Sequence, residues 1–353
     1  MNAQSWPWLL LLAGLLLSLV LCLAVEKLAR RFNWLDQPEP RRVHKIPVPR
    51  LGGVGMAVAF LPLAVIIGER SLPVNFLPEM RWGLLGALLI TASQVPDDLR
   101  GLRPLTKLLL QVGAAAIPVA AGLRIDHVST PFNNPINPNP LASPIALPPL
   151  VAIVVTIIWF VGMINAVNAL DGIDGLAGGV VAIAAGVLAL HTARYMGEEL
   201  GVAFLLALLA AVCVGFLWWN WPPARLIMGD TGSHFLGYTL AMLSILGGAR
   251  LATALLILGI PILDYAYVIY TRVRTGRGAM RFDMGHLHHR LISAGFSLPA
   301  ILCLLYGLTI LAGMAALFLA KTQKLFAFFV LAGLAFVVIV ALPRRGGDEA
   351  RGR

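Results

Sequence analysis

Charged residues are scarce in this chain of 353 residues, at 12% of the total, whereas hydrophobic residues make up 59%. These proportions lie outside the range of soluble globular domains and exclude a water-soluble single core. The same apolar content excludes intrinsic disorder. Cysteine is scarce as well, and each of the three residues lies in a separate apolar run, which excludes a disulfide scaffold and predicts thiols in the membrane: Cys22, Cys213 and Cys303.

Long apolar runs recur along the whole chain, and its mean hydropathy is +0.84. Each run matches the thickness of a bilayer core at about 1.5 Å per residue. We therefore predict an all-α polytopic membrane protein, with one integral membrane domain over 1–353 that includes a basic cytoplasmic tail at 343–353. The eleven predicted transmembrane helices cover 8–25, 52–68, 82–95, 105–121, 149–164, 176–192, 200–217, 234–248, 251–270, 298–318 and 325–342.

The positive-inside rule orients these spans. The first span is interpreted as a retained anchor rather than a signal peptide, because no basic residue precedes it and Lys27 and Arg30 follow it. Alternating spans place most of the 27 Lys and Arg residues on one face, which is predicted to be cytoplasmic, with the N-terminus outside and the C-terminus inside. The Pro- and Asn-rich outer loop at 122–148 is expected to be irregular.

The net charge of +10 does not indicate a nucleic-acid partner, because the basic residues lie in short loops beside spans rather than in a domain of their own. Anionic lipids or phosphate-bearing substrates explain them better. The sequence leaves both a monomer and a homodimer open.

Five polar clusters are not explained by hydropathy, and the predicted topology places all of them at the cytoplasmic face. This coincidence is the main indication of function. The clusters are VHKIPVPRLGG (43–53), PDDLRGLRPLTK (96–107), NAVNALDGIDGLAGG (165–179), MGDTGSHFLG (228–237) and RFDMGHLHHRL (281–291).

Five aspartates of these clusters are expected near the mouths of apolar helices: Asp97, Asp98, Asp171, Asp174 and Asp230. Carboxylates gathered there repel one another and are desolvated unless a cation offsets them. Mg²⁺ suits such a site because it prefers oxygen ligands and is commonly shared between one or two carboxylates and substrate phosphates; Mn²⁺ is the alternative. Taken alone, Asp97 and Asp98 are equally well explained as a solvated pair of loop charges.

Asn165, Asn168, Asp171 and Asp174 recur at every third position, so a helix would place successive members on one groove. The competing interpretation is that the asparagines cap a span and the neighbouring glycines pack helices. Asp230 lies just before the span at 234–248, where helical N–H groups favour anions. A simple N-cap is the competing interpretation of Asp230, but it does not require glycine on both sides.

His286, His288 and His289 lie in a basic loop with Arg290. Their spacing matches no common zinc motif, so contacts to phosphate or sugar are preferred over zinc. Asp264, in ILDYAYVIY, is an ionisable residue within a predicted span and is functional by default, unless it only pairs with a basic neighbour. His234 is interpreted as an ordinary core or interfacial histidine.

The ordered motifs resemble those of the polyprenyl-phosphate N-acetylhexosamine-1-phosphate transferases, classed as glycosyltransferase family 4. The resemblance extends from the HKIPVPRLGG loop to the HLHHRL loop and rests on PDDLRG followed by Lys107, NAVNALDGIDGLAGG, GDTGSHFLG, PILDYAYV and DMGHLHHRL. One departure is Pro96, before the aspartates, which biases Val95 away from helical conformation.

The resemblance implies transfer of a sugar-1-phosphate from a UDP-sugar to undecaprenyl phosphate, with release of UMP, at the cytoplasmic face of a bacterial inner membrane. The DMGHLHHRL segment resembles the branch that uses UDP-N-acetylglucosamine or a related N-acetylhexosamine. The peptidoglycan branch, with its muramoyl-pentapeptide nucleotide, is the runner-up. A cation or proton transporter is the rival from another class, but it predicts ionisable groups on both sides of the membrane. A structural scaffold, the third class, predicts tolerance of Asp97→Asn and Asp230→Asn.

The residues and the resemblance together suggest a division of roles. Asn168 and Asp230 are the expected metal ligands, with Asp98 as a further or water-mediated one. Asp97 is expected to act on the lipid phosphate as base or orienting group, and Asp171 and Asp174 on substrate or metal-bound water; a double displacement stays open. The residues expected to bind substrate are Arg50, Lys107, Asn165, His286, His288, His289 and Arg290.

Overall fold

The computed structural model describes residues 6–37, 47–128, 145–195, 200–247, 251–275, 285–319 and 321–341. The described chain is almost entirely helical, in agreement with the predicted all-α class. The helices are α1 (Trp6–Arg31), α2 (Gly52–Ser71), α3 (Leu77–Arg100), α4 (Pro104–Ala120), α5 (Pro149–Leu170), α6 (Leu176–Tyr195), α7 (Gly201–Asn220), α8 (Gly229–Leu246), α9 (Leu251–Ile257), α10 (Gly259–Arg274), α11 (Leu287–Ser293), α12 (Leu298–Phe318) and α13 (Lys321–Ala341), with a 3₁₀ turn at Val74–Phe76.

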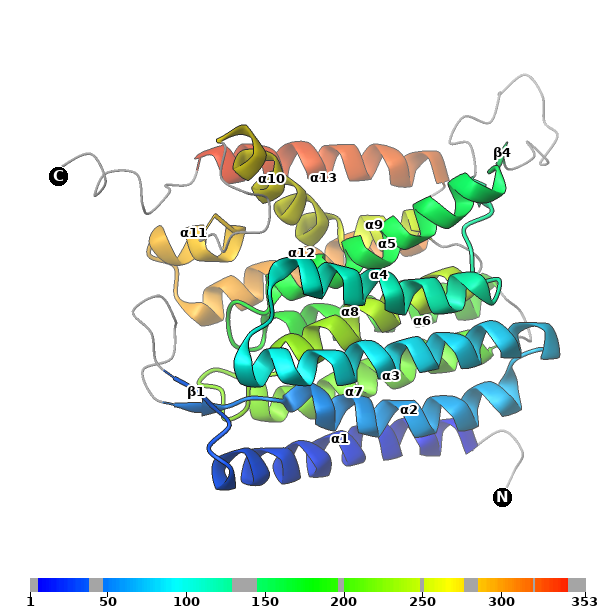
Figure 1. Cartoon of the computed structure of the whole chain (residues 1–353). Coiled ribbons are helices and arrows are strands. Elements are labelled where there is room, and N and C mark those ends of the chain that lie inside the picture. The colour runs from blue at the N-terminus through cyan, green and yellow to red at the C-terminus, as the bar shows by residue number, and fades with distance from the viewer. Residues whose placement is uncertain are drawn as a thin grey trace.

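Two short antiparallel hairpins connect helices: β1 (Leu35–Asp36) pairs with β2 (Val48–Pro49), and β3 (His127–Val128) pairs with β4 (Ile145–Ala146). The β3–β4 pair lies in the loop that was expected to be irregular, and 129–144 are outside the described residues. Figure 1 shows the long helices lying side by side, with β1 and α11 at one end of the bundle and β4 at the other.

Helix α8 forms the centre of the bundle and packs against α2, α3 and α5. Every residue of α8 except Asp230 is buried. The peripheral helices expose large apolar side chains instead, such as Trp8 and Leu12 on α1, Leu150 on α5 and Phe318 on α12. This surface is typical of a protein that is surrounded by lipid on its flanks.

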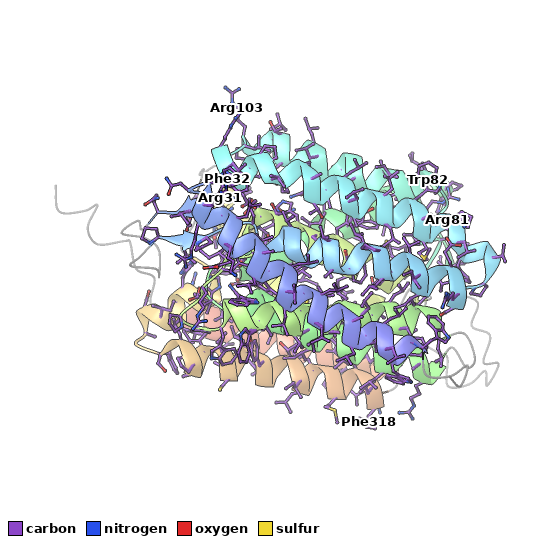
Figure 2. All side chains as sticks on the ribbon, turned by 90° about the horizontal axis from the view of Figure 1, so that it is seen from below. Arg31, Phe32, Arg81, Trp82, Arg103 and Phe318 are labelled. Atoms are coloured by element: carbon purple, nitrogen blue, oxygen red, sulfur yellow. The ribbon has the colours of Figure 1, made fainter. Side chains whose placement is uncertain are left out.

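Among the described helices, six are long and apolar enough to cross a membrane: Trp6–Arg31, Gly52–Ser71, Pro149–Leu170, Leu176–Arg194, Gly201–Asn220 and Leu298–Phe318. The chain is therefore a multi-pass helical membrane protein. Figure 2 shows Arg31 and Arg103, assigned to the cytoplasmic face by sequence, at one end of the bundle and Arg81 at the other. All three cysteines are free thiols within helices α1, α7 and α12.

Two expectations about helix continuity are wrong. The predicted span at 251–270 is divided into α9 and α10 at Leu258, because Pro261 lacks an N–H and its ring clashes with the carbonyl four residues earlier, at Ile257. Conversely, α3 continues through Pro96 as far as Arg100. The bias at Val95 is small, and the contacts of Asp98 with α8 outweigh it.

Candidate active site

The candidate site lies at the end of the bundle that carries the β1–β2 hairpin. The C-terminal end of α3 provides Asp97 and Asp98, the first turn of α4 provides Lys107, the end of α5 provides Asn168, and the first turn of α8 provides Asp230. Residues far apart in sequence are therefore brought together, as the predicted clustering requires.

Lys107 joins two of the carboxylates. Its Nζ lies 2.5 Å from Asp97 Oδ2 and 2.6 Å from Asp230 Oδ2. Asp97 Oδ1 accepts a further hydrogen bond from the backbone N–H of Leu102 at 2.5 Å, which fixes the direction of its carboxylate. Asp97 and Asp230 therefore converge on one position, which the ammonium group of Lys107 occupies.

Asp98 points in a different direction and caps the N-terminus of α8. Its Oδ1 accepts from the backbone N–H of Asp230 at 2.9 Å, and its Oδ2 accepts from the N–H and the hydroxyl of Thr231 at 3.0 and 2.5 Å. Gly229 adopts φ +71°, and a Cβ there would overlap the Asp98 carboxylate. The cap of α8 is thus Asp98 rather than Asp230, and this leaves the Asp230 side chain available for other partners.

Loss of this cap should destabilise the protein. Asp98→Ala is expected to lower the free energy of unfolding by about 1–3 kcal/mol, because buried N–H donors at the start of α8 lose their acceptor. Thermal unfolding in detergent measures the effect. Asp98→Asn is the matched control, since it keeps one oxygen acceptor and should cost less. Equal melting of Asp98→Ala and the wild type would contradict the assignment.

The asparagines of α5 connect α4 and α8. Asn168 Nδ2 donates to Ser233 Oγ at 2.9 Å and approaches Asp230 Oδ1 at 3.3 Å. Asn165 Nδ2 donates to Gln111 Oε1 at 2.7 Å and to the carbonyl of Val161 at the same distance. The amide nitrogen of Asn168 is therefore engaged with α8.

The predicted groove of four residues extends only as far as Asp171. Helix α5 ends at Leu170 and Asp171 is its C-cap, so Asp174 does not continue the row. Instead, buried Asp174 accepts a hydrogen bond at 2.9 Å from the backbone N–H of Ala224 and so holds the loop before α8. Desolvation raises the pKa of Asp171 well above its usual range, and the negative charges of Asp230 and Asp98 add to this effect.

Backbone hydrogen bonds hold the start of α2, which follows the β1–β2 hairpin, against the same site. The N–H groups of Gly52 and Gly53 donate to the carbonyls of Ile227 and Met228, each at 3.0 Å. Gly53 crosses Gly232 so closely that a Cβ on Gly53 would overlap the Gly232 backbone. N-capping of α8 does not explain Gly232, the second glycine of GDTGS. The close contact between α2 and α8 requires glycine there.

Arg50 lies at the base of this hairpin. Its Nη1 is 3.3 Å from Asp36 Oδ1 and 3.5 Å from the carbonyl oxygen of Asp98. Its Nε is buried and has no hydrogen-bond partner among the described residues. The preceding residues of the motif, 43–46, are outside the described residues.

The histidines form a second cluster beside the first. His286 Nδ1 lies 2.8 Å from Asp264 Oδ2, and the Arg290 guanidinium lies 5.5 Å from the centre of the Tyr267 ring. His288 is buried against Gly172, where a Cβ would overlap its ring, so α11 packs on the turn that follows Asp171. Burial lowers the pKa of His288 well below its usual range. His289 is only partly buried, and Asp283, which precedes the histidines in the RFDMGHLHHRL motif, is outside the described residues.

The donor set fits Mg²⁺. Within the described parts of the chain, no three His, Cys, Asp or Glu side chains form a ready-made metal cage. Mg²⁺ does not need one, since one or two carboxylates, waters and substrate phosphates suffice. The shared cation position between Asp97 and Asp230 supports the fit, and the histidines show no zinc-like cluster in those parts.

Two polar residues of the site were missed or underestimated by the sequence analysis. Gln111 contacts Asn165 and lies 2.9 Å from His234, Nε2 to Nε2. A buried amide is costly in an apolar helix unless it is paired, so the isolated Gln111 within 105–121 was a usable signal. His234 is buried, as expected of a core histidine, but it contacts Gln111 and so adjoins the candidate site.

A multi-pass helical bundle with acidic residues and a lysine gathered at one end defines the class, a membrane-embedded enzyme. The model of "Glycosyl transferase family 4" matches residues 80–248. The chain is 32% identical over 345 residues to a Bacillus subtilis protein named "Probable undecaprenyl-phosphate N-acetylglucosaminyl 1-phosphate transferase", covering 94% of this chain and 90% of that protein. This chain therefore belongs to glycosyl transferase family 4, and the resemblance seen in its motifs is confirmed.

Two further relatives separate the branches of the family. A "Decaprenyl-phosphate N-acetylglucosaminephosphotransferase" of Mycolicibacterium smegmatis is 30% identical over 375 residues, covering 97% of this chain and 91% of that protein. A "Phospho-N-acetylmuramoyl-pentapeptide-transferase" of Chlorobium phaeovibrioides is 36% identical, but over only 137 residues, or 36% of each chain. The similarity to the first branch thus covers nearly the whole chain.

Proposed function

We propose that this protein transfers N-acetylglucosamine-1-phosphate from UDP-N-acetylglucosamine to undecaprenyl phosphate, releases UMP and so initiates synthesis of a cell-envelope glycopolymer. The observation that carries the proposal is the convergence of Asp97 and Asp230 on one cation position at the end of an intramembrane bundle. A prenyl chain requires an apolar environment, whereas its phosphate requires a polar one, and this end of the bundle offers both. The names of the full-length relatives support the same reaction.

Asp230 and Asn168 are the residues that would hold Mg²⁺, or Mn²⁺ in its place. When bound, the metal neutralises charge on the diphosphate. Asp230 has one carboxylate oxygen near Asn168 and the other near Lys107. The amide nitrogen of Asn168 is engaged with Ser233, so its amide oxygen is the proposed metal ligand. The first turn of α8 adds the partial positive charge of a helix N-terminus.

The transfer needs positioning more than covalent chemistry. An oxygen of the acceptor phosphate attacks the β-phosphorus of the UDP-sugar, the bond between this phosphorus and the bridging oxygen breaks, and UMP leaves with that oxygen. Because the second pKa of a phosphate is about 6, the acceptor is mostly dianionic at neutral pH. Asp97 therefore orients the acceptor phosphate rather than deprotonating it, while Lys107 moves from the carboxylates to the incoming phosphates.

The remaining residues contact the sugar nucleotide or support the site. Asp171 holds bound water or substrate at the rim, and Arg50, Asn165, His286, His289 and Arg290 surround the nucleotide sugar. Asp98, Asp174 and His288 keep these groups in place through α8, the 222–226 loop and the turn at Gly172.

We place the site at the cytoplasmic face of a bacterial inner membrane. The excess of basic residues at this end supports the orientation, with eleven crossings, the N-terminus outside and the C-terminus inside. The basic tail at 343–353 is outside the described residues.

A donor panel tests the function. Purified protein is incubated with Mg²⁺, undecaprenyl phosphate and one UDP-sugar at a time, and UMP and the lipid-linked product are quantified. UDP-N-acetylglucosamine is expected to be the best donor, and a chelator should abolish turnover. Turnover with the muramoyl-pentapeptide nucleotide alone would select the other branch, and no UMP from any UDP-N-acetylhexosamine would refute the proposal.

A further inference from the structure

Asp264 lies outside the acidic cluster, and both of its carboxylate oxygens are used by the histidine segment. Asp264 is on α10 and is 3% exposed. Its Oδ2 lies 2.8 Å from His286 Nδ1, and its Oδ1 accepts from the backbone N–H of Leu287, also at 2.8 Å. An ionised carboxylate can only accept hydrogen bonds, so Nδ1 of His286 carries the proton in this contact.

These two bonds also anchor α11. His286 is the N-cap of this helix, but no side chain within the segment caps it. Asp264 supplies the missing acceptor from α10, and Tyr267, three residues further along the same helix, contacts Arg290. Helix α10 therefore holds the HLHHRL segment from one face.

Asp264 itself has little room to contact a substrate. The cavity beside it has a volume of about 20 Å³, which is roughly the space of one water molecule, and its lining is mostly apolar, including Leu170, Pro261 and Leu305. His286, in contrast, has a side chain that is 12% exposed. With Nδ1 engaged, Nε2 is the ring nitrogen left for a ligand.

His286 and His288 also differ in accessibility. His286 and His288 stack with parallel rings at 5.9 Å, but His288 is 2% exposed and lies against Gly172. Of this stacked pair, only His286 is both held by a carboxylate and accessible.

We infer that Asp264 is a positioning residue: it fixes the tautomer and direction of His286 so that Nε2 contacts a phosphate or sugar oxygen of the nucleotide sugar. This inference rests on the proposed function for the identity of the ligand, but the Asp264–His286 contact does not depend on it. A carboxylate that orients a histidine in this way affects the bound ligand through that histidine rather than by direct contact.

A double-mutant cycle in the full-length protein tests the inference. Asp264→Asn should lower kcat/KM for UDP-N-acetylglucosamine by roughly 10- to 100-fold, the effect of losing a charged hydrogen bond, and leave KM for undecaprenyl phosphate unchanged. His286→Gln should cost at least as much, and the double variant should be no worse than His286→Gln. Additive losses, or an equal rise in both KM values, would overturn the inference. Tyr267→Phe, which keeps the ring beside Arg290, is the matched control.

A spectroscopic measurement on the wild type covers the case in which Asp264→Asn fails to fold. In protein with ¹⁵N-labelled histidine, the signals lost in His286→Gln identify this side chain, and its Nδ1 should be protonated. A neutral imidazole protonated only at Nε2 would overturn the inference even if every donor is turned over. Conversely, absence of turnover by the wild type, with the Nδ1–H signature intact, would refute the proposed function and leave the Asp264–His286 arrangement standing.

Discussion

Asp230→Asn is expected to lower kcat by roughly 10²- to 10³-fold, the size of effect seen when a group that stabilises transition-state charge is removed. The change preserves the shape of the side chain but removes the negative charge that pairs with Lys107 and that is proposed to bind Mg²⁺. It should also weaken metal binding in the absence of substrate. UMP release measures the first effect, and Mn²⁺ binding followed by electron paramagnetic resonance measures the second.

Asp126→Asn is the matched control for this variant. Asp126 is an exposed carboxylate that lies 3.7 Å from Arg124, outside the acidic cluster, so the same chemical change should leave both readouts unaltered. If Asp230→Asn kept wild-type turnover and wild-type Mn²⁺ affinity, the assignment of the metal site to α8 would be wrong.

Lys107→Met is expected to move metal affinity and turnover in opposite directions. The ammonium group competes for the two carboxylates that it now joins, at 2.5 and 2.6 Å, and its removal leaves them with their full negative charge. Mn²⁺ should then bind roughly tenfold more tightly, since close charges in a partly screened site interact by a few kcal/mol. Turnover should nevertheless fall by about 100-fold, because a cation that neutralises phosphate charge is lost.

Lys107→Arg separates charge from shape in this experiment. It retains the positive charge, so the metal affinity should stay close to that of the wild type, while turnover falls because the guanidinium cannot replace a compact ammonium. Weaker Mn²⁺ binding in Lys107→Met would contradict the view that Lys107 and the metal share one position.

Much of the candidate site could be predicted from the clustering of polar motifs, but the directions of Asp97 and Asp98 could not. Adjacent residues of a helix point roughly 100° apart, so two neighbouring aspartates at the end of α3 serve different elements. Asp97 faces Lys107, and Asp98 faces the backbone of α8. Only the packing of α3 on α8 decides which carboxylate becomes the cap.

Local pattern also failed where a helix ends earlier than spacing or hydropathy predicts. The spacing of three residues predicted that Asp174 continues the row from Asn165, but the chain leaves α5 at Leu170, and Asp174 holds Ala224 instead. Similarly, hydropathy predicted one helix over 251–270, whereas the chain divides before Pro261. In contrast, the sequence alone marked Asp264 as a residue with a functional role or a charged partner, because an ionisable residue in an apolar run requires a partner.

Since α8 is enclosed by other helices, the residue that begins its first turn is separated from the lipid. A thicker or thinner bilayer acts on the helices that expose apolar side chains, such as α1 and α12, which can tilt to match it. Asp230 keeps its place under such tilting, because α8 is buried among other helices. Asp97 and Lys107 lie on α3 and α4, which also expose apolar side chains such as Leu88 and Leu109, so bilayer thickness should act on the site through these two helices.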